Sequence, residues 1–196
     1  LEQLEYRFID RFGNIYFPSE LQRNSTANQC PDAGAFMLEF VGGFTPEEEG
    51  TICQVFFDLS SLISSAQQGI PVRIKKDFFS SNQVLGAATA FYLEDLSAEG
   101  CGLETSMIWQ LINTDIDYQG LFANSFVAGQ IILNTSLSSN DEWHTLDMDG
   151  PGGFSSPSIS SSDLDLYSVV LHEALHLLGF SSRIKADGNP HNGFFS

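Results

Sequence analysis

Two histidines, His172 and His176, stand four positions apart, and Glu173 directly follows the first of them. On an α-helix, residues i and i+4 lie on the same face, so both imidazoles can reach a single metal ion. Glu173 is rotated away from that line and can contact a water molecule at the metal without binding the metal itself. This HExxH pattern predicts Zn²⁺ bound by the two histidines, with Glu173 as the general base of a hydrolytic reaction.

The surrounding residues predict a helix over 163–179 that positions the motif. Ser162 and Asp165 have the spacing of a capping box at its start. Gly179 can end it in a left-handed turn, with Phe180 packing back. A mostly apolar stripe at helical spacing runs through Leu164, Ser168, Leu171, Leu175 and Leu178. The alternative is an ordinary amphipathic core helix whose histidines are solvated or hydrogen-bonded.

The run from His172 to Phe180 reads HExxHxxGF and resembles the metzincin clan of the zincin metallopeptidases, in particular the leishmanolysin type. The resemblance implies a secreted zinc endopeptidase with a protein or peptide substrate. It also implies an α+β fold: a zincin-like N-terminal subdomain with a twisted mixed β-sheet, a long backing helix and an active-site helix. The strong similarity covers about a dozen residues.

The third metal ligand is the point at which the sequence departs from the metzincin pattern. Ser182 stands where these proteins usually have a histidine or aspartate, and no methionine follows the motif. Glu173 is the last glutamate, which excludes a glutamate ligand further along the chain. His191, Asp187 or a residue beyond 196 remain as third ligands. We therefore expect residues 1–196 to be one catalytic domain whose C-terminal subdomain is mostly absent.

Composition supports a globular protein outside the nucleic-acid-binding classes. The chain has 196 residues, 42% of them hydrophobic, which suits a single domain. A net charge of −17 argues against nucleic acids and anionic membranes as partners, because basic patches supply that affinity. No apolar run approaches the roughly 20 residues of a membrane span. We expect a secreted, extracellular monomer.

Three cysteines, Cys30, Cys53 and Cys101, allow one disulfide with one thiol left over, or a further partner beyond residue 196. The sequence does not decide the pairing. An alternative for Cys30, which precedes a proline and an aspartate, is the cysteine switch that latches some metzincin pro-segments onto zinc. We favour a structural disulfide.

The elements before the motif follow from periodicity and turn signals. A long helix is predicted from Thr45 to about Ser65, because threonine, proline and glutamate stand at its cap, N1 and N3 positions. A short helix is predicted over 103–111 and a long loop over 134–161. Strands are predicted over 35–41, 72–78, 86–92 and 126–133. We expect the last strand to be the exposed edge that binds substrate in zincins, and its Gly129 to mark a bulge or a close backbone approach.

Other residues with metal-binding side chains are weaker candidates. The run 147–150 (Asp-Met-Asp-Gly) resembles the start of a calcium loop but lacks the later glutamate of an EF-hand. We interpret it as a solvated turn, with Ca²⁺ as the alternative. His144 is interpreted as a surface or packing histidine. Two other functions remain open: a catalytically incomplete, metalloprotease-like binding domain, and an interaction domain with a fortuitous motif.

Overall fold

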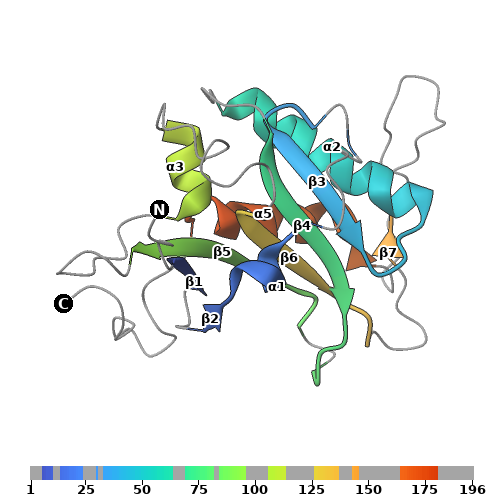
Figure 1. Cartoon of the computed structure of the whole chain (residues 1–196). Helices are drawn as coiled ribbons and strands as arrows, with labels where there is room; N and C mark the ends of the chain where they lie inside the picture. The colour runs from blue at the N-terminus through green and yellow to red at the C-terminus, as the bar shows by residue number, and fades with distance from the viewer. Residues whose placement is uncertain are drawn as a thin grey trace, which may run out of the picture.

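The computed structural model of the chain describes residues 6–10, 14–23, 30, 33–63, 69–81, 84–95, 106–113, 126–136, 143–145 and 164–180. These residues form a six-stranded mixed β-sheet with helices packed against it (Figure 1). The strand order is β2-β1-β5-β6-β4-β3. The predicted α+β class is confirmed.

The strands β3 (Phe36–Val41), β4 (Ile70–Asp77) and β6 (Gly129–Asn134) are parallel and form one half of the sheet. The other half is antiparallel. It consists of β5 (Gly86–Asp95), β1 (Tyr6–Asp10) and β2 (Ile15–Tyr16). Because parallel neighbours need a crossover, a helix connects β3 to β4.

That crossover helix is α2 (Pro46–Leu62), which confirms the long helix predicted from Thr45 and ends three residues before the predicted end. Thr45 Oγ1 accepts a hydrogen bond from Glu48 N, and Glu48 Oε2 accepts one from Thr45 N, so both halves of the capping box are present. The helix buries Ile52, Val55, Phe56 and Leu59 against the sheet, while Ile63, its C-cap, is partly buried.

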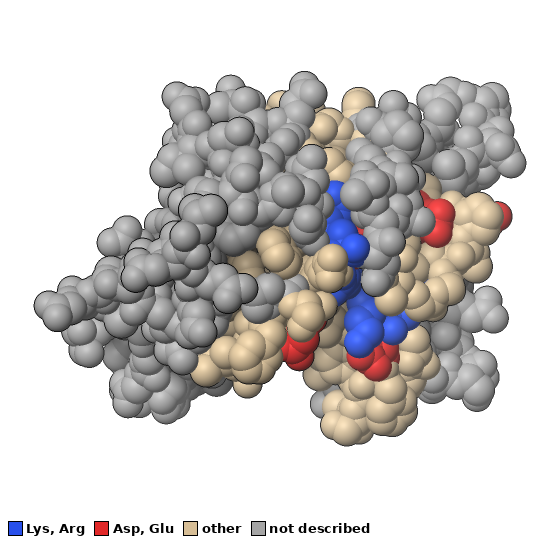
Figure 2. Space-filling model, in the orientation of Figure 1, with Lys and Arg blue, Asp and Glu red and all other residues tan. Residues whose placement is uncertain are grey.

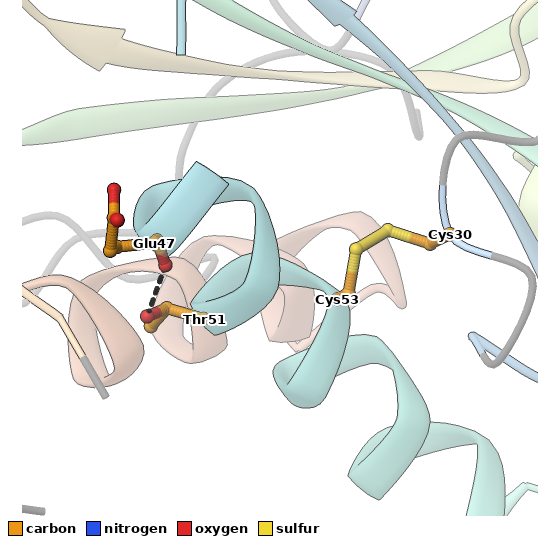
Figure 3. Close-up of a disulfide and its surroundings, with 4 residues drawn as sticks. All are labelled: Cys30, Glu47, Thr51 and Cys53. Carbon is orange, nitrogen blue, oxygen red and sulfur yellow. Dashed lines mark hydrogen bonds between the residues drawn. A yellow bond between two sulfur atoms is a disulfide. The ribbon is translucent and has the colours of Figure 1, made fainter. Parts of the chain in front are cut away.

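A disulfide joins Cys53 on α2 to Cys30 in the segment before β3, with the Cα atoms 5.6 Å apart (Figure 3). Figure 3 also shows Thr51 donating a hydrogen bond to the Glu47 carbonyl one turn earlier in the helix. The cysteine-switch alternative has no free thiol at Cys30. Cys101 lies outside the described residues.

Helix α5 (Leu166–Leu177) packs beside α2 on the same face of the sheet, over β5 and β6 (Figure 1). Tyr167 on α5 donates a hydrogen bond of 2.6 Å to Asp58 on α2. The strand residues beneath α5 are small: a side chain at Gly129 would lie within 3.0 Å of Leu177 and 2.7 Å of Ile108. The close backbone approach predicted at Gly129 is confirmed, and Ile108 belongs to α3 (Met107–Asn113).

The opposite face of the sheet meets α1 (Pro18–Leu21) through a buried arginine. Arg73 on β4 forms a 2.9 Å ion pair with Glu39 on β3 and donates hydrogen bonds to the Glu20 and Gln22 carbonyls. Figure 2 shows the basic side chains of this face as a band with acidic side chains next to it. The band follows β4, where Arg73 and Lys75 are both paired with carboxylates.

The predicted strands 35–41, 72–78 and 86–92 correspond to β3, β4 and β5, and part of the predicted helix 103–111 is α3. The expectation that 126–133 forms an exposed edge is wrong, because β6 lies between β4 and β5. The sequence signals missed β1 and β2, which extend the sheet beyond β5. Of the predicted loop 134–161, residues 143–144 form the short strand β7 (Trp143–His144), which pairs with β8 (Leu164–Asp165).

No helix in the described part of the chain is long and apolar enough to cross a membrane.

Candidate metal centre

The helix that carries the HExxH motif begins at Leu166 instead of residue 163, because Asp165 is its N-cap. The Asp165 carboxylate accepts a hydrogen bond of 3.2 Å from Tyr167 N and one from the Ser168 hydroxyl. Leu164 and Asp165 pair with β7 as the strand β8, which keeps them out of the helix. The predicted capping box with Ser162 as N-cap is therefore wrong, and the cap lies three residues later.

The buried face of α5 differs from the predicted stripe. The buried residues are Leu166, Val170, Glu173, Ala174 and Leu177, whereas Ser168 is exposed and Leu171, Leu175 and Leu178 are half-buried. At about 100° per residue, Glu173 lies at the border of this buried face, about 60–100° from the two histidines. The motif therefore turns both imidazoles away from the sheet and Glu173 toward it.

The structure brings the two predicted histidine ligands together. His172 Nε2 and His176 Nε2 lie 3.0 Å apart, with ring centroids 4.5 Å apart and the ring planes at 87°. His172 is exposed and His176 is half-buried. The two Nε2 atoms are therefore within hydrogen-bond distance of each other, on a side of α5 that is open to solvent.

The end of α5 fixes the orientation of His176. Gly179 adopts φ 92°, Gly179 N donates to the His176 carbonyl, and Phe180 N donates to the Leu175 carbonyl, which is a Schellman motif. The predicted left-handed turn is confirmed, although Phe180 does not pack back, because its side chain is 68% exposed. The turn carries the Phe180 carbonyl to 2.8 Å from His176 Nδ1.

This carbonyl contact determines which histidine nitrogen is available to a metal. A carbonyl oxygen only accepts hydrogen bonds, so Nδ1 of His176 carries the proton and Nε2 keeps its lone pair. Such a hydrogen bond behind a ligating imidazole is the usual way to fix its tautomer. The sequence does not identify this acceptor, because a backbone carbonyl has no residue-type signature.

The histidine pair fits Zn²⁺. A tetrahedral ion with Zn–N distances of about 2.0–2.1 Å holds two ligand nitrogens roughly 3.3 Å apart. The Nε2 atoms at 3.0 Å need to separate by only a few tenths of an ångström. Imidazole nitrogen with an N–H bond behind it is also the donor that zinc prefers.

Glu173, the predicted general base, is 7% exposed and lies against the start of β5. A Cβ atom added at Gly86 would be 3.1 Å from Glu173 Cγ and 3.5 Å from its Oε1. The carboxylate is thus placed between the buried helix face and the side that carries the histidines. Gly86 is a second contributor to the site that the sequence did not indicate.

Most of the remaining predicted site residues lie outside the described segments. Within the described segments, no third His, Cys, Asp or Glu completes a metal-binding group. His191, Asp187, Ser182 and the run 147–150 lie outside the described residues. His144 is placed on β7 next to Asp165, before the first turn of α5. Asp165, the neighbour of His144, precedes His172 by about seven residues, which corresponds to roughly 10 Å of rise along a helix.

Comparison of the chain with protein-family models, with curated proteins and with solved structures finds no match. The function assigned to this site therefore depends on the geometry of α5 and its surroundings.

Proposed function

We propose that the chain is a zinc-dependent endopeptidase of the zincin type, in which His172 and His176 hold Zn²⁺ and Glu173 is the general base. The observation that carries the proposal is the convergence of the two Nε2 atoms at 3.0 Å on a helix that also directs Glu173 to their flank. The motif would supply two of the three protein ligands of a catalytic zinc site, together with the general base.

In this mechanism the zinc ion supplies a Lewis acid that lowers the pKa of water toward about 7 and polarises the scissile carbonyl. Glu173 removes the proton from the attacking water and passes it to the leaving amine. The Glu173 carboxylate is buried between α5 and β5, which limits the access of bulk water to it. The hydrogen bond from His176 Nδ1 to the Phe180 carbonyl would hold the imidazole ring so that its Nε2 could bind the metal.

The outer edge of β5 next to Glu173 supports a peptide substrate. Phe91 N donates to the Ala128 carbonyl and Asn134 N donates to the Leu85 carbonyl, which fixes the alternation of the ladder between β5 and β6. The peptide groups of the intervening residues Gly86, Ala88 and Ala90 therefore point away from β6. On that side β1 pairs only with residues 91–95 of β5, so among the described strands none covers 86–90. An extended peptide can pair there by strand addition.

The proposal also includes the arrangement of the elements, the third ligand and the extracellular location. The zincin-like arrangement corresponds to β3, α2, β4, β5, β6 and α5, with α2 as the backing helix and α5 as the active-site helix. A third ligand comes from His191, Asp187 or a residue beyond 196. The disulfide Cys30–Cys53 supports an oxidising, extracellular location.

The decisive experiment measures zinc per chain by elemental analysis of the purified protein. We expect one equivalent in the wild type and in His144→Ala, the matched histidine control, and loss of the metal in His176→Ala. No zinc in the wild type would contradict the proposal. Loss of zinc in His191→Ala, with zinc retained in Asp187→Ala, would identify the third ligand.

A second function, a zinc-binding domain without catalysis, is favoured by one observation: no third ligand joins the histidine pair among the described residues. It predicts stoichiometric zinc and no cleavage of any unfolded protein. Measured turnover of a denatured, reduced protein substrate by the wild type would exclude this function.

A further inference from the structure

Gly86 is a glycine whose backbone conformation does not require glycine. It lies in the regular part of β5, and it is not among the glycines with positive φ, which are Gly34, Gly42, Gly43, Gly69 and Gly179. Within a strand, glycine weakens the structure and often marks a close approach of another group. The reason for a glycine at position 86 is therefore steric and lies in the side chain packed above it.

What lies above it is the side chain of Glu173. A Cβ at position 86 would be 3.1 Å from Glu173 Cγ, 3.5 Å from Oε1 and 3.3 Å from the Ile132 carbonyl of the neighbouring strand. A carbon–carbon distance of 3.1 Å is below the optimum of about 3.5–4.0 Å, so the methyl group would displace the glutamate. The strand carbonyl cannot move without breaking the ladder, so the added methyl group presses on the Glu173 side chain.

The same residue also belongs to residues 86–90 of β5, with which no described strand pairs on the side away from β6. The peptide groups of Gly86, Ala88 and Ala90 point away from β6, and β1 pairs with β5 only from Phe91 onward. At position 86, one face of β5 lies against the Glu173 side chain. The backbone groups directed away from β6 can pair with an extended peptide.

We propose that Gly86 is the positioning residue for Glu173: its missing side chain sets how closely the carboxylate approaches a peptide paired with the edge of β5. This proposal depends on the proposed peptidase function for its catalytic part. The steric contact between positions 86 and 173 stands independently of that function. The methyl group would displace the glutamate by a few tenths of an ångström. Because a displacement of about 1 Å at a reacting group costs around 100-fold in rate, this smaller shift should lower the rate severalfold.

The steric contact is tested by thermal unfolding of four proteins: wild type, Gly86→Ala, Glu173→Ala and the double variant. Overpacking by one methyl group lowers the melting temperature by roughly 2–8 °C in a protein of this size. In the Glu173→Ala background Cγ is gone and only the contact with the Ile132 carbonyl remains, so we expect Gly86→Ala to cost clearly less than in the wild-type background. An equal loss in both backgrounds would overturn the contact.

The catalytic part is tested by steady-state kinetics on a peptide cleaved by the wild type. We expect Gly86→Ala to lower kcat by about 3- to 10-fold, with KM within twofold of wild type and one zinc per chain retained. In the Glu173→Gln background, Gly86→Ala should leave the residual rate unchanged, because the two residues act together. Wild-type kcat in Gly86→Ala would overturn the proposal.

Gly129→Ala is the matched control, since it places the same methyl group under the same helix. Its Cβ would meet Ile108 and Leu177, neither of which belongs to the metal centre. We expect a lower melting temperature with kcat retained per folded molecule. If the wild type binds no zinc and cleaves nothing, the proposed function fails, and the unfolding cycle still reports on the contact between positions 86 and 173.

Discussion

Two glutamates in this protein, Glu48 on α2 and Glu173 on α5, are each 7% exposed, yet the structure uses them differently. Glu48 accepts hydrogen bonds from Lys76 Nζ at 2.8 and 2.7 Å and from Thr45 N at 2.8 Å. Its carboxylate ties the first turn of α2 to β4. Glu173 instead lies over a glycine, at the border between the buried face of α5 and its two histidines.

The same difference extends to the two helices. Helix α2 packs large side chains on large ones, as in the edge-to-face contact of Phe56 with Phe36, whose ring centroids are 5.0 Å apart. Helix α5 packs over Gly86 and Gly129. Helix α2 thus contacts the sheet through large apolar side chains. Helix α5 lies over glycines, so it approaches the strands closely and buries less apolar area there. This close approach determines where Glu173 lies.

The largest expected effect tests whether the two glutamates, Glu173 and Glu48, have different roles. Glu173→Gln should lower kcat by about 10²–10⁴-fold, because general-base catalysis contributes that much, with zinc content unchanged. Glu48→Gln should keep kcat and lose about 1–3 kcal/mol of stability through its weakened contact with Lys76. Peptide-cleavage kinetics and urea unfolding on both variants measure the two effects. Equal kcat in Glu173→Gln and wild type would remove the assigned role of Glu173.

The next effect tests whether α2 is purely structural. Phe56→Ala removes a fully buried ring that packs against Phe36 and should cost about 3–5 kcal/mol of unfolding free energy. Measured at a temperature where the variant is still folded, zinc content and kcat should match the wild type. A loss of zinc from the folded variant would show that α2 contributes to the metal centre.

A somewhat smaller effect concerns the covalent link of α2 to the segment before β3. The cysteines of the disulfide are 23 residues apart in the sequence, and a loop of that size corresponds to about 3 kcal/mol in the chain-entropy treatment. Cys30→Ser with Cys53→Ser should lower the melting temperature accordingly and leave zinc bound. A reducing agent should lower the wild-type melting temperature and have no effect on the double variant.

The smallest effect concerns the hydrogen bond between the two helices. Burial, together with the Asp58 carboxylate, raises the pKa of Tyr167 to about 12 from its ordinary value of 10.0. A raised pKa in the folded state means that this contribution is complete below pH 10 and is lost as the pH rises through 12. Tyr167→Phe should cost about 1 kcal/mol at neutral pH.

Thermal unfolding from pH 8 to 12 measures this difference. We expect the gap in melting temperature between wild type and Tyr167→Phe to close above pH 10. Tyr16, whose pKa burial also raises to about 12, serves as the control, because Tyr16→Phe removes a contact on β2 and leaves the link between the helices intact. A gap that is constant with pH would contradict the ionisation argument.

Much of the parallel half of the sheet could be predicted from local signals. Thr45 and Glu48 mark the start of α2 by their own side-chain chemistry, and the strands β3 and β4 alternate apolar residues between clear turns. The start of α5 was misplaced because Ser162 and Asp165 offer two competing caps. The choice of Asp165 depends on the pairing of Leu164 with Trp143, a contact between distant segments.

The sequence by itself determined the chemistry of the candidate site: two imidazoles and a carboxylate at helical spacing, followed by a glycine that ends the helix. Only the tertiary structure decided that Glu173 lies over Gly86 and that β6 is interior. The physical reason is that residue types and spacing fix donor atoms and their order along a helix. Sheet order and the contact between positions 86 and 173 depend instead on segments far apart in the chain, which no local pattern encodes.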